Sequence, residues 1–349
     1  MIYFTTFFDK NYLSRGLVLF DSLSKLNEQY KLFLLCLDSD VYDFFDQNKN
    51  MFSDIVLIKL SELEEEDSLL KGCKSNRSIV EYYFTLSPCL PLFLLNKYNL
   101  PHICSLDADI KFYSSPKVIF ESLEEYSIII TPHKFSKENF NLVEWGKYNV
   151  SFQIFKNNAI GVKCLTKWRS QCIDWCKDVL DTESNRFADQ KYLDTWLVDY
   201  KGSVKVLNDS TSGIAPWNVG DFQINLENEQ FMSNSEPLVF YHFHHLKAIS
   251  KYWFSTGFHI YNVKVSEGLK HLYRDYLCDV GNKNKFLKQD FSVVVNLRKP
   301  DSRNLRVKLL EENQVFLKIR NLNVFFDLKK TNRLLKFFIF KIYAKVNRN

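Results

Sequence analysis

The sequence places two acidic residues one position apart at the end of a strand-like stretch. Asp107 and Asp109 flank Ala108 and follow residues 102–106. In an extended segment, residues i and i+2 point to the same face, so both carboxylates would lie on one side. Paired carboxylates suit a hard divalent cation that bridges to phosphate oxygens. The triplet therefore predicts a metal site, with an ordinary strand-end turn of solvated acids as the alternative.

A cluster of histidines offers further ligands. His242, His244 and His245 are three of only seven histidines in the chain. In a strand, His242 and His244 would share a face, and an imidazole there could complete a metal site begun by the aspartates. Half-buried structural histidines are the alternative. Lys247 follows closely and could neutralise a phosphate.

Two further pairs of residues suit a substrate with many hydroxyl groups. Asp189 and Gln190 open a helix-like segment, where they would either cap the helix or present a carboxylate and an amide to the substrate. Trp217 and Asn218 follow a proline. An exposed indole can cover the apolar face of a sugar ring while an amide bonds its hydroxyls, whereas a tryptophan in the core after a proline turn is the alternative.

The elements that must position these residues alternate between strands and helices. Strand-like patterns occupy residues 2–8, 30–37, 54–60, 102–107, 127–131, 150–155 and 238–243. Helical spacing occupies residues 17–26, 79–95, 163–180 and 189–197. We expect an interruption of the second helix near Pro88 and Pro91, because proline lacks a backbone donor and clashes in a helix interior. The alternation predicts an α/β fold with a parallel or mixed sheet and crossover helices.

Composition excludes several classes of protein. The 349 residues are 46% apolar and 25% charged, which excludes a disordered or collagen-like chain. Neither a run of about 20 uncharged apolar residues nor a glycine-rich phosphate loop is present. Eight cysteines without a CxxC pair are typical of reduced core thiols. The first 13 residues lack the features of a secretory signal, so we expect a cytoplasmic location.

The net charge of +5 is concentrated at the end of the chain. Residues 330–349 contain six lysines and arginines and no acid, which leaves 40 basic and 41 acidic residues elsewhere. The nearly neutral body argues against a nucleic-acid partner. Apolar residues at roughly helical spacing among these cations predict an interfacial helix on an anionic membrane surface. A terminal helix docked on the protein's own core is the alternative.

The order of these motifs resembles that of GT-A nucleotide-sugar glycosyltransferases, in particular the retaining glycosyltransferase family 8. Residues 3–12 look like the family's first strand and uridine-contacting loop, and residues 106–110 look like its DxD motif. Residues 149–152 are similar to its Asn-x-Gly strand, with Ser151 where glycine is usual. Residues 187–193 look like its Asp-Gln helix, and residues 237–247 look like the segment that supplies a histidine and a lysine. The resemblance covers about residues 1–250.

The resemblance implies the GT-A (Rossmann-like) fold, with a mixed, mostly parallel sheet flanked by helices and a C-terminal appendage. It implies a catalytic domain over residues 1–255 and an extension over 256–349. It assigns Asp189 and Gln190 to catalysis, and a metal to Asp107, Asp109 and His242, with His244 as the next choice. The donor would contact Thr5, Thr6, Tyr12, Arg77, Tyr82, Asp107, Asp109, Asn149, Trp217, Asn218 and Lys247.

The implied function is the metal-dependent transfer of a sugar from a UDP-sugar, with Mn²⁺ or Mg²⁺, to a saccharide or lipid-linked saccharide. Retention would follow from entry of the acceptor on the leaving-group face, because Gln190 is a poor nucleophile. Richness in Lys, Asn, Ile and Phe favours an AT-rich bacterial genome and hence surface glycan synthesis at the inner face of the cytoplasmic membrane. A sugar-phosphate nucleotidyltransferase and a non-catalytic binding protein of the same fold are the alternatives.

Overall fold

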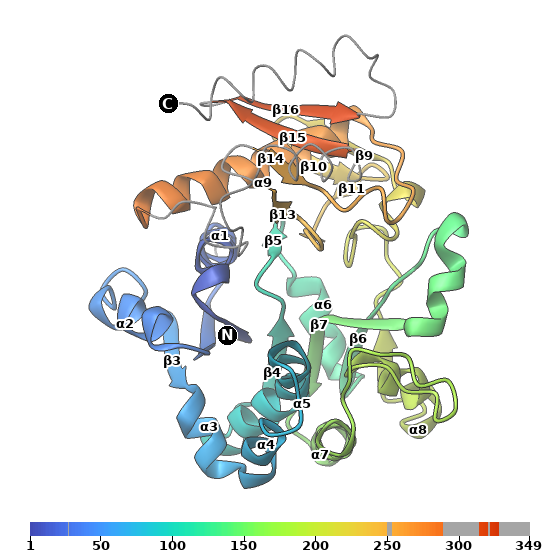
Figure 1. Cartoon of the computed structure of the whole chain (residues 1–349). Helices are drawn as coiled ribbons and strands as arrows, with labels where there is room; N and C mark the ends of the chain where they lie inside the picture. Colours follow the sequence, from blue (N-terminus) through green and yellow to red (C-terminus); the bar gives the residue numbers. More distant parts are fainter. Residues whose placement is uncertain (27, 250–252, 289–313, 320–321, 328–349) are drawn as a thin grey trace.

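The computed structural model describes residues 1–349 except 27, 250–252, 289–313, 320–321 and 328–349. At its centre lies a seven-stranded sheet with the order β3-β2-β1-β4-β7-β6-β8 (Figure 1). Its strands are β1 (Ile2–Phe8), β2 (Tyr30–Cys36), β3 (Ile55–Lys59), β4 (His102–Leu106), β6 (Ile128–Pro132), β7 (Tyr148–Lys156) and β8 (Val204–Val206). Strand β7 runs antiparallel to β4 and β6, while the other pairings are parallel. The predicted mixed, mostly parallel α/β sheet is therefore confirmed.

Helices cover both faces of this sheet, because alternate residues of its strands are apolar in both directions. In β2, Leu32 and Leu34 enter one core and Phe33 and Leu35 enter the other. The first core contains residues of α1 (Leu13–Ser24), α2 (Ser39–Gln47) and α6 (Lys117–Glu121). The second contains residues of α3 (Leu60–Glu66), α4 (Ser68–Cys73), α5 (Ile79–Tyr98), α7 (Ala159–Asp174) and α8 (Trp196–Asp199).

Helix α5 corrects the expected interruption at Pro88 and Pro91. It is continuous over 20 residues with both prolines inside it. Its first turn is closed by a capping box between Ser78 and Glu81. Both prolines are buried, together with leucines that pack into the second core. Burial of this face outweighs the two backbone hydrogen bonds that proline cannot make.

Smaller strands form a second layer above the sheet (Figure 1). Strand β5 (Ile110–Phe112) pairs with β12 (Phe240–His242), and β9 (Ile224–Glu227), β10 (Gln230–Ser233) and β11 (Glu236–Pro237) form a sheet of their own. A further sheet contains β13 (Lys247–Ala248), β14 (Trp253–Ser255), β15 (Gln314–Ile319) and β16 (Leu322–Asp327). Short 3-10 helices connect these parts: η1 (Lys10–Tyr12), η2 (Ser122–Glu124), η3 (Lys137–Trp145), η4 (Gln190–Thr195) and η5 (Val219–Asp221).

Helix α9 (Glu267–Phe286) was not predicted from the sequence. It packs against α1, and its buried Leu272 and Tyr276 share a core cluster with Val18 and Phe243. The domain boundary at residue 255 remains a prediction. The predicted membrane-surface helix over residues 330–349 lies outside the described residues. No helix within the described ranges has the length and apolar character needed to cross a membrane. All eight cysteines are free and only Cys278 is exposed, as expected for reduced core thiols.

Ion pairs of the buried Lys111 connect α9 to β5, the strand that follows Asp107 and Asp109. Lys111 in β5 lies 2.5 Å from Asp275 Oδ2 and 2.6 Å from Asp279 Oδ2. We expect Asp275→Asn/Asp279→Asn to lower the free energy of unfolding by about 3 kcal/mol, because it leaves a buried ammonium without a counter-charge. Lys111→Met should cost less, since both aspartates are partly exposed and can be solvated. Urea unfolding measures both, and the reverse order would contradict this account.

Candidate active site

The turn after β4 carries the two predicted metal-binding aspartates. The Asp107 N–H donates to the Ser151 carbonyl at 2.9 Å, which fixes the end of β4 against β7. The Ile110 N–H donates back to the Asp107 carbonyl at 3.3 Å, and β5 begins there. Asp109 is 8% exposed, while the side chain of Asp107 is 40% exposed. Both carboxylates therefore lie on one tight connection at the carboxyl end of a parallel strand.

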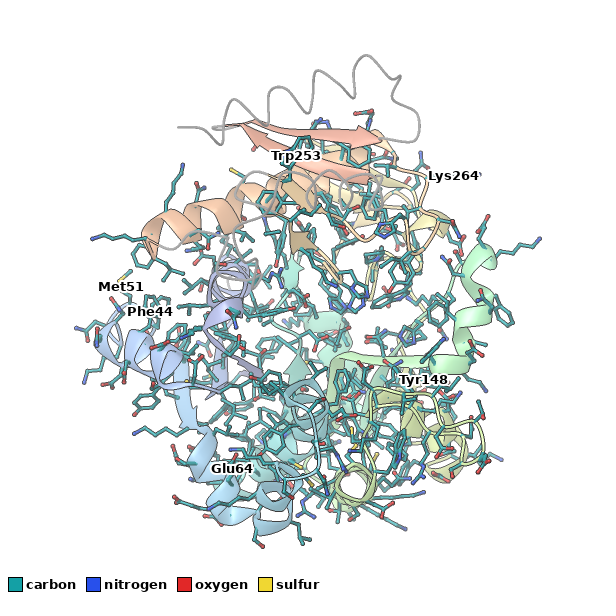
Figure 2. All side chains as sticks on the ribbon, in the orientation of Figure 1. Phe44, Met51, Glu64, Tyr148, Trp253 and Lys264 are labelled. Carbon is teal, nitrogen blue, oxygen red and sulfur yellow. The ribbon has the colours of Figure 1, made fainter. Side chains whose placement is uncertain are left out.

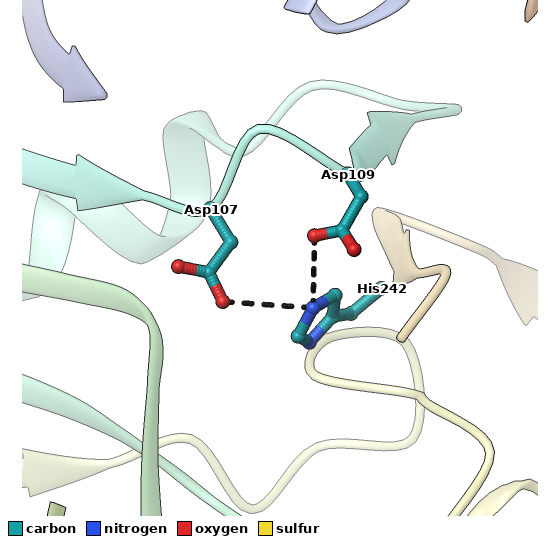
Figure 3. Close-up of side chains that lie close together, drawn as sticks. All are labelled: Asp107, Asp109 and His242. Carbon is teal, nitrogen blue, oxygen red and sulfur yellow. Dashed lines mark ion pairs between the residues drawn. The ribbon is translucent and has the colours of Figure 1, made fainter. Parts of the chain in front are cut away.

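Strand β12 brings His242 to these carboxylates. Its pairing with β5 places His242 opposite Ile110, and the His242 N–H donates to the Ile214 carbonyl at 2.9 Å. Nε2 of His242 then lies 3.0 Å from Asp109 Oδ1 and 3.5 Å from Asp107 Oδ2 (Figure 3). One potential ligand atom from each residue falls within 4.8 Å of the others. Asp109 and His242 are 133 positions apart in the sequence, and the pairing of β5 with β12 brings them together.

The charges of this group fit a divalent cation. Burial raises the pKa of Asp107 to about 6, and His242 offsets only part of that effect. Burial opposes ionisation of Asp109 too, but attraction to His242 prevails and holds the Asp109 pKa below its usual range. Burial likewise disfavours charged His242, yet the aspartates raise its pKa. The one positive charge of protonated His242 therefore balances only part of the negative charge of the two carboxylates. A divalent cation would suit two carboxylate oxygens and one deprotonated imidazole nitrogen.

His244 lies beside this group without belonging to it. Its ring centroid is 5.3 Å from that of His242 and 5.0 Å from that of Trp217. Burial lowers the pKa of His244 well below its usual value, so its imidazole is neutral. The carboxylates cluster with His242, and His244 is not part of the group of ligand atoms.

We therefore expect different effects from the two histidines. His242→Ala should weaken Mn²⁺ binding by more than about 10-fold, because it removes a ligand. His244→Ala should weaken it by less than about 3-fold, since it changes only a neighbouring ring. Titration of each folded variant with Mn²⁺, followed by the electron paramagnetic resonance of the free ion, measures both affinities. Equal losses would assign His244 to the metal as well.

A cavity of about 490 Å³ opens beside the metal group. Seven residues predicted from the sequence line it: Asp107, Asn149, Asp189, Gln190, Trp217, His242 and His244. These residues come from five separate parts of the chain, so the structure brings seven of the fifteen predicted site residues to one cavity. The cavity also has lining residues that the sequence analysis did not select, among them His133, Phe135, Leu142, Trp145, Ile260 and Tyr261.

Asp189 and Gln190 lie at the start of η4, facing the cavity. The backbone carbonyl of Asp189 accepts the Trp168 Nε1–H at 2.8 Å, while its Oδ2 is buried and makes no hydrogen bond with any described residue. Burial raises the pKa of the Asp189 carboxyl to about 7. The Gln190 amide donates to the Trp145 carbonyl at 2.9 Å. Asp189 therefore has an unsatisfied oxygen for a substrate hydroxyl, whereas Gln190 also holds a neighbouring loop.

Asn149 and Asn218 use their amides within the protein. The Asn149 Oδ1 accepts both the backbone N–H and the hydroxyl of Ser151, at 3.1 and 2.6 Å. Asn218 is fully buried and bonds the Ala215 N–H and two backbone carbonyls. Trp217 is only 4% exposed and packs edge-on against His242 and His244, so it forms a wall of the cavity.

The remaining predicted donor contacts do not line the cavity. Arg77 donates to the carbonyl of Ile173 at 3.0 Å, and the Tyr82 hydroxyl donates to Glu64 at 2.8 Å. In Figure 2, Glu64 lies in the lower part of the molecule. The Thr5 hydroxyl donates to the Phe33 carbonyl at 3.0 Å, and Thr6 is buried beside it. Lys247 is exposed on β13.

Tyr12 lies near the metal group but is not part of the cavity lining. The buried guanidinium of Arg15 sits 4.3 Å from the centre of the Tyr12 ring and donates to the Leu246 carbonyl at 2.7 Å. Its positive charge helps to lower the pKa of Asp109. Arg15 escaped the sequence analysis, although it stands three residues after Tyr12 in the same predicted loop and helix.

Comparisons with known proteins agree with this architecture. The chain matches no protein-family model. It is 25% identical over 280 residues to YfnD of Bacillus subtilis (strain 168), with 80% of this chain and 88% of YfnD covered. It is 28% identical over 256 residues to YfnF of the same strain, with 71% of this chain and 82% of YfnF covered. Both relatives are described only as uncharacterized proteins.

Among solved structures, the galactosyltransferase LgtC in complex with donor and acceptor sugar analogues aligns with a TM-score of 0.51. The identity is 13%, and the alignment covers 80% of this chain and 96% of LgtC. The glycosyltransferase GlyE of Streptococcus pneumoniae aligns with a TM-score of 0.49 at 16% identity, over 86% of this chain and 66% of GlyE. The likeness to LgtC confirms the GT-A fold predicted from the sequence.

Proposed function

We propose that the chain is a metal-dependent glycosyltransferase that moves a hexose from a UDP-sugar to a saccharide or lipid-linked saccharide. The observation that carries the proposal is the group of Asp107, Asp109 and His242 at the edge of a cavity that also holds Asp189 and Gln190. The candidate metal ligands and the polar groups proposed to bind hydroxyls thus lie beside one cavity. A role in bacterial surface glycan synthesis on the cytoplasmic side is part of the same proposal and rests on the sequence.

The residues of the metal group would hold the diphosphate of the donor. Asp107, Asp109 and His242 would bind a Mn²⁺ or Mg²⁺ ion, which stabilises the negative charge that grows on the leaving diphosphate. The buried Arg15, next to Asp109, adds a fixed positive charge on the side where Tyr12 lies. Asp189 would accept hydrogen bonds from donor hydroxyls and hold the sugar ring in one orientation.

The transfer forms one bond and breaks another at the anomeric carbon. An acceptor hydroxyl oxygen bonds to that carbon while the bond from the carbon to the β-phosphate oxygen breaks. The electron pair leaves with UDP, and the hydroxyl proton passes to the departing phosphate oxygen. The Gln190 amide is a weak nucleophile and is tied to the Trp145 carbonyl, so entry of the acceptor on the leaving-group face, with retention, is the proposed route.

The first test measures thermal stability with UDP, GDP and CDP, each with and without Mn²⁺. A ligand well above its dissociation constant raises Tm through binding to the folded state alone. We expect a shift with UDP that requires Mn²⁺, followed by sugar transfer or slow donor hydrolysis with UDP-hexoses. No shift with any nucleotide would refute the proposal. A shift without transfer or hydrolysis would identify a binding protein, and release of pyrophosphate from UTP and a sugar phosphate would identify a nucleotidyltransferase.

A further inference from the structure

The cavity beside the metal group has polar and apolar lining residues. Asp107, His242 and Asp189 line it, and the proposed function places the sugar of the donor beside them. Leucine, isoleucine and aromatic side chains line it as well: Phe135, Leu142, Trp145, Phe187, Ile260 and Tyr261. Of these, Ile260 is 47% exposed, which leaves an aliphatic side chain open to water at the rim.

Contacts within the protein hold this apolar wall in place. The amide of Asn139, itself 4% exposed, donates to the Tyr261 carbonyl at 2.8 Å and to the Trp217 carbonyl at 3.3 Å. It thereby ties η3, the green helix at the right of Figure 1, to two other segments of the wall. Trp145 packs edge-on against Phe187 with ring centroids 4.8 Å apart. A wall held by such contacts loses little conformational freedom when a ligand covers it.

The nucleotide does not compete for this wall. Thr5, Thr6 and Tyr12, the residues predicted to meet the uridine, all lie outside the cavity lining. Tyr12 and Arg15 lie near Asp109, and none of these three residues is part of the cavity lining. With the diphosphate at the metal group, a nucleoside bound by these residues would lie outside the cavity, and the transferred sugar would extend into it toward Asp189. The group that meets the apolar wall is then part of the acceptor.

We propose that the acceptor is a glycoside whose group next to the reacting sugar is apolar, as in a glycolipid, and that Leu142, Ile260 and Tyr261 bind that group. This proposal rests on the proposed function, since it needs the donor sugar beside Asp189. It selects the lipid-linked acceptor over a free saccharide. Only the sugar hydroxyl of the acceptor reacts, and its apolar group stays unchanged.

The test compares n-octyl and methyl β-glucosides, both below the micellar concentration of the former, as ligands of the protein loaded with UDP and Mn²⁺. Isothermal titration calorimetry gives the two dissociation constants, and the same pairs of galactosides and N-acetylglucosaminides follow. We expect the octyl glycoside to bind at least about 10-fold more tightly than its methyl partner, because it covers apolar surface that the methyl group cannot reach.

Two variants distinguish binding of the alkyl chain to this wall from nonspecific binding elsewhere on the protein. Ile260→Ser should reduce the octyl preference to less than about 3-fold, because it makes the rim polar. The control Val118→Ser changes an equally aliphatic side chain, 64% exposed on α6, and should keep the preference. Equal affinity of octyl and methyl glycosides, or an unchanged octyl preference in Ile260→Ser, would overturn this proposal and leave the proposed function standing. Failure of wild-type protein to bind UDP with Mn²⁺ would overturn the proposed function and this proposal together.

Discussion

Asp107→Ala is expected to lower kcat/KM by about 1000-fold or more while the protein stays folded. The carboxylate is one of three groups that would hold the cation, and its loss removes stabilisation of the leaving diphosphate. The side chain is 40% exposed at the end of β4, so its removal opens no cavity in the core. Sugar transfer and Mn²⁺-dependent UDP binding should therefore disappear together, with Tm of the metal-free protein within about 2 °C of wild type.

A control variant at another exposed carboxylate tests whether the loss of activity is specific to Asp107. Asp46→Ala removes an exposed carboxylate on α2, far along the chain from the metal group, and should leave transfer, UDP binding and Tm unchanged. Transfer rates are compared at saturating Mn²⁺ and again with excess chelator. If Asp107→Ala retains wild-type turnover, the assignment of Asp107 to a catalytic metal is wrong, whatever the fold.

Local sequence patterns were sufficient to predict strands of the central sheet. Residues 2–8 and 30–37 were predicted as strands and form β1 and β2 within one residue, because strands buried on both faces have continuous apolar stretches. Helix α5 was misjudged at its prolines, since the rule that proline breaks helices treats a helix as isolated. The tertiary burial that keeps α5 intact comes from strands and helices distant in the sequence.

The candidate site was predicted in part for a similar reason. Asp107 and Asp109 were visible as a short motif, but their meeting with His242 depends on the β5–β12 ladder. The resemblance assigned Arg77 and Tyr82 to the donor; here they bond to Ile173 and Glu64 and do not line the cavity, so their role stays a prediction. The apolar wall of the cavity was not predicted, since Leu142 and Ile260 have no distinguishing pattern in their segments.

Asp189→Asn is expected to reduce kcat/KM by about 100-fold and yet to stabilise the protein. The loss of activity follows from the weaker hydrogen bonds that a neutral amide offers to donor hydroxyls. The gain in stability follows from burial. Asp189 is 2% exposed, its Oδ2 makes no hydrogen bond with any described residue, and burial raises its pKa from an ordinary value of 3.8 to about 7. Holding this carboxylate ionised therefore costs free energy in the folded state.

The raised pKa of Asp189 in the folded protein sets the direction in which the free energy of unfolding changes with pH. Between pH 4 and pH 7 the unfolded chain releases the Asp189 proton while the folded protein keeps it. The free energy of unfolding therefore falls as pH rises, by about 1 kcal/mol per unit, and levels off above pH 7. Asp189→Asn removes this contribution, so its advantage over wild type in urea unfolding with chelator present should grow from pH 4 to pH 7 and then stay constant. Asp46→Asn, an exposed control, should show no such growth. An advantage independent of pH would mean that the Asp189 carboxylate is not held at a raised pKa, and its place as the unsatisfied oxygen of the cavity would have to be given up.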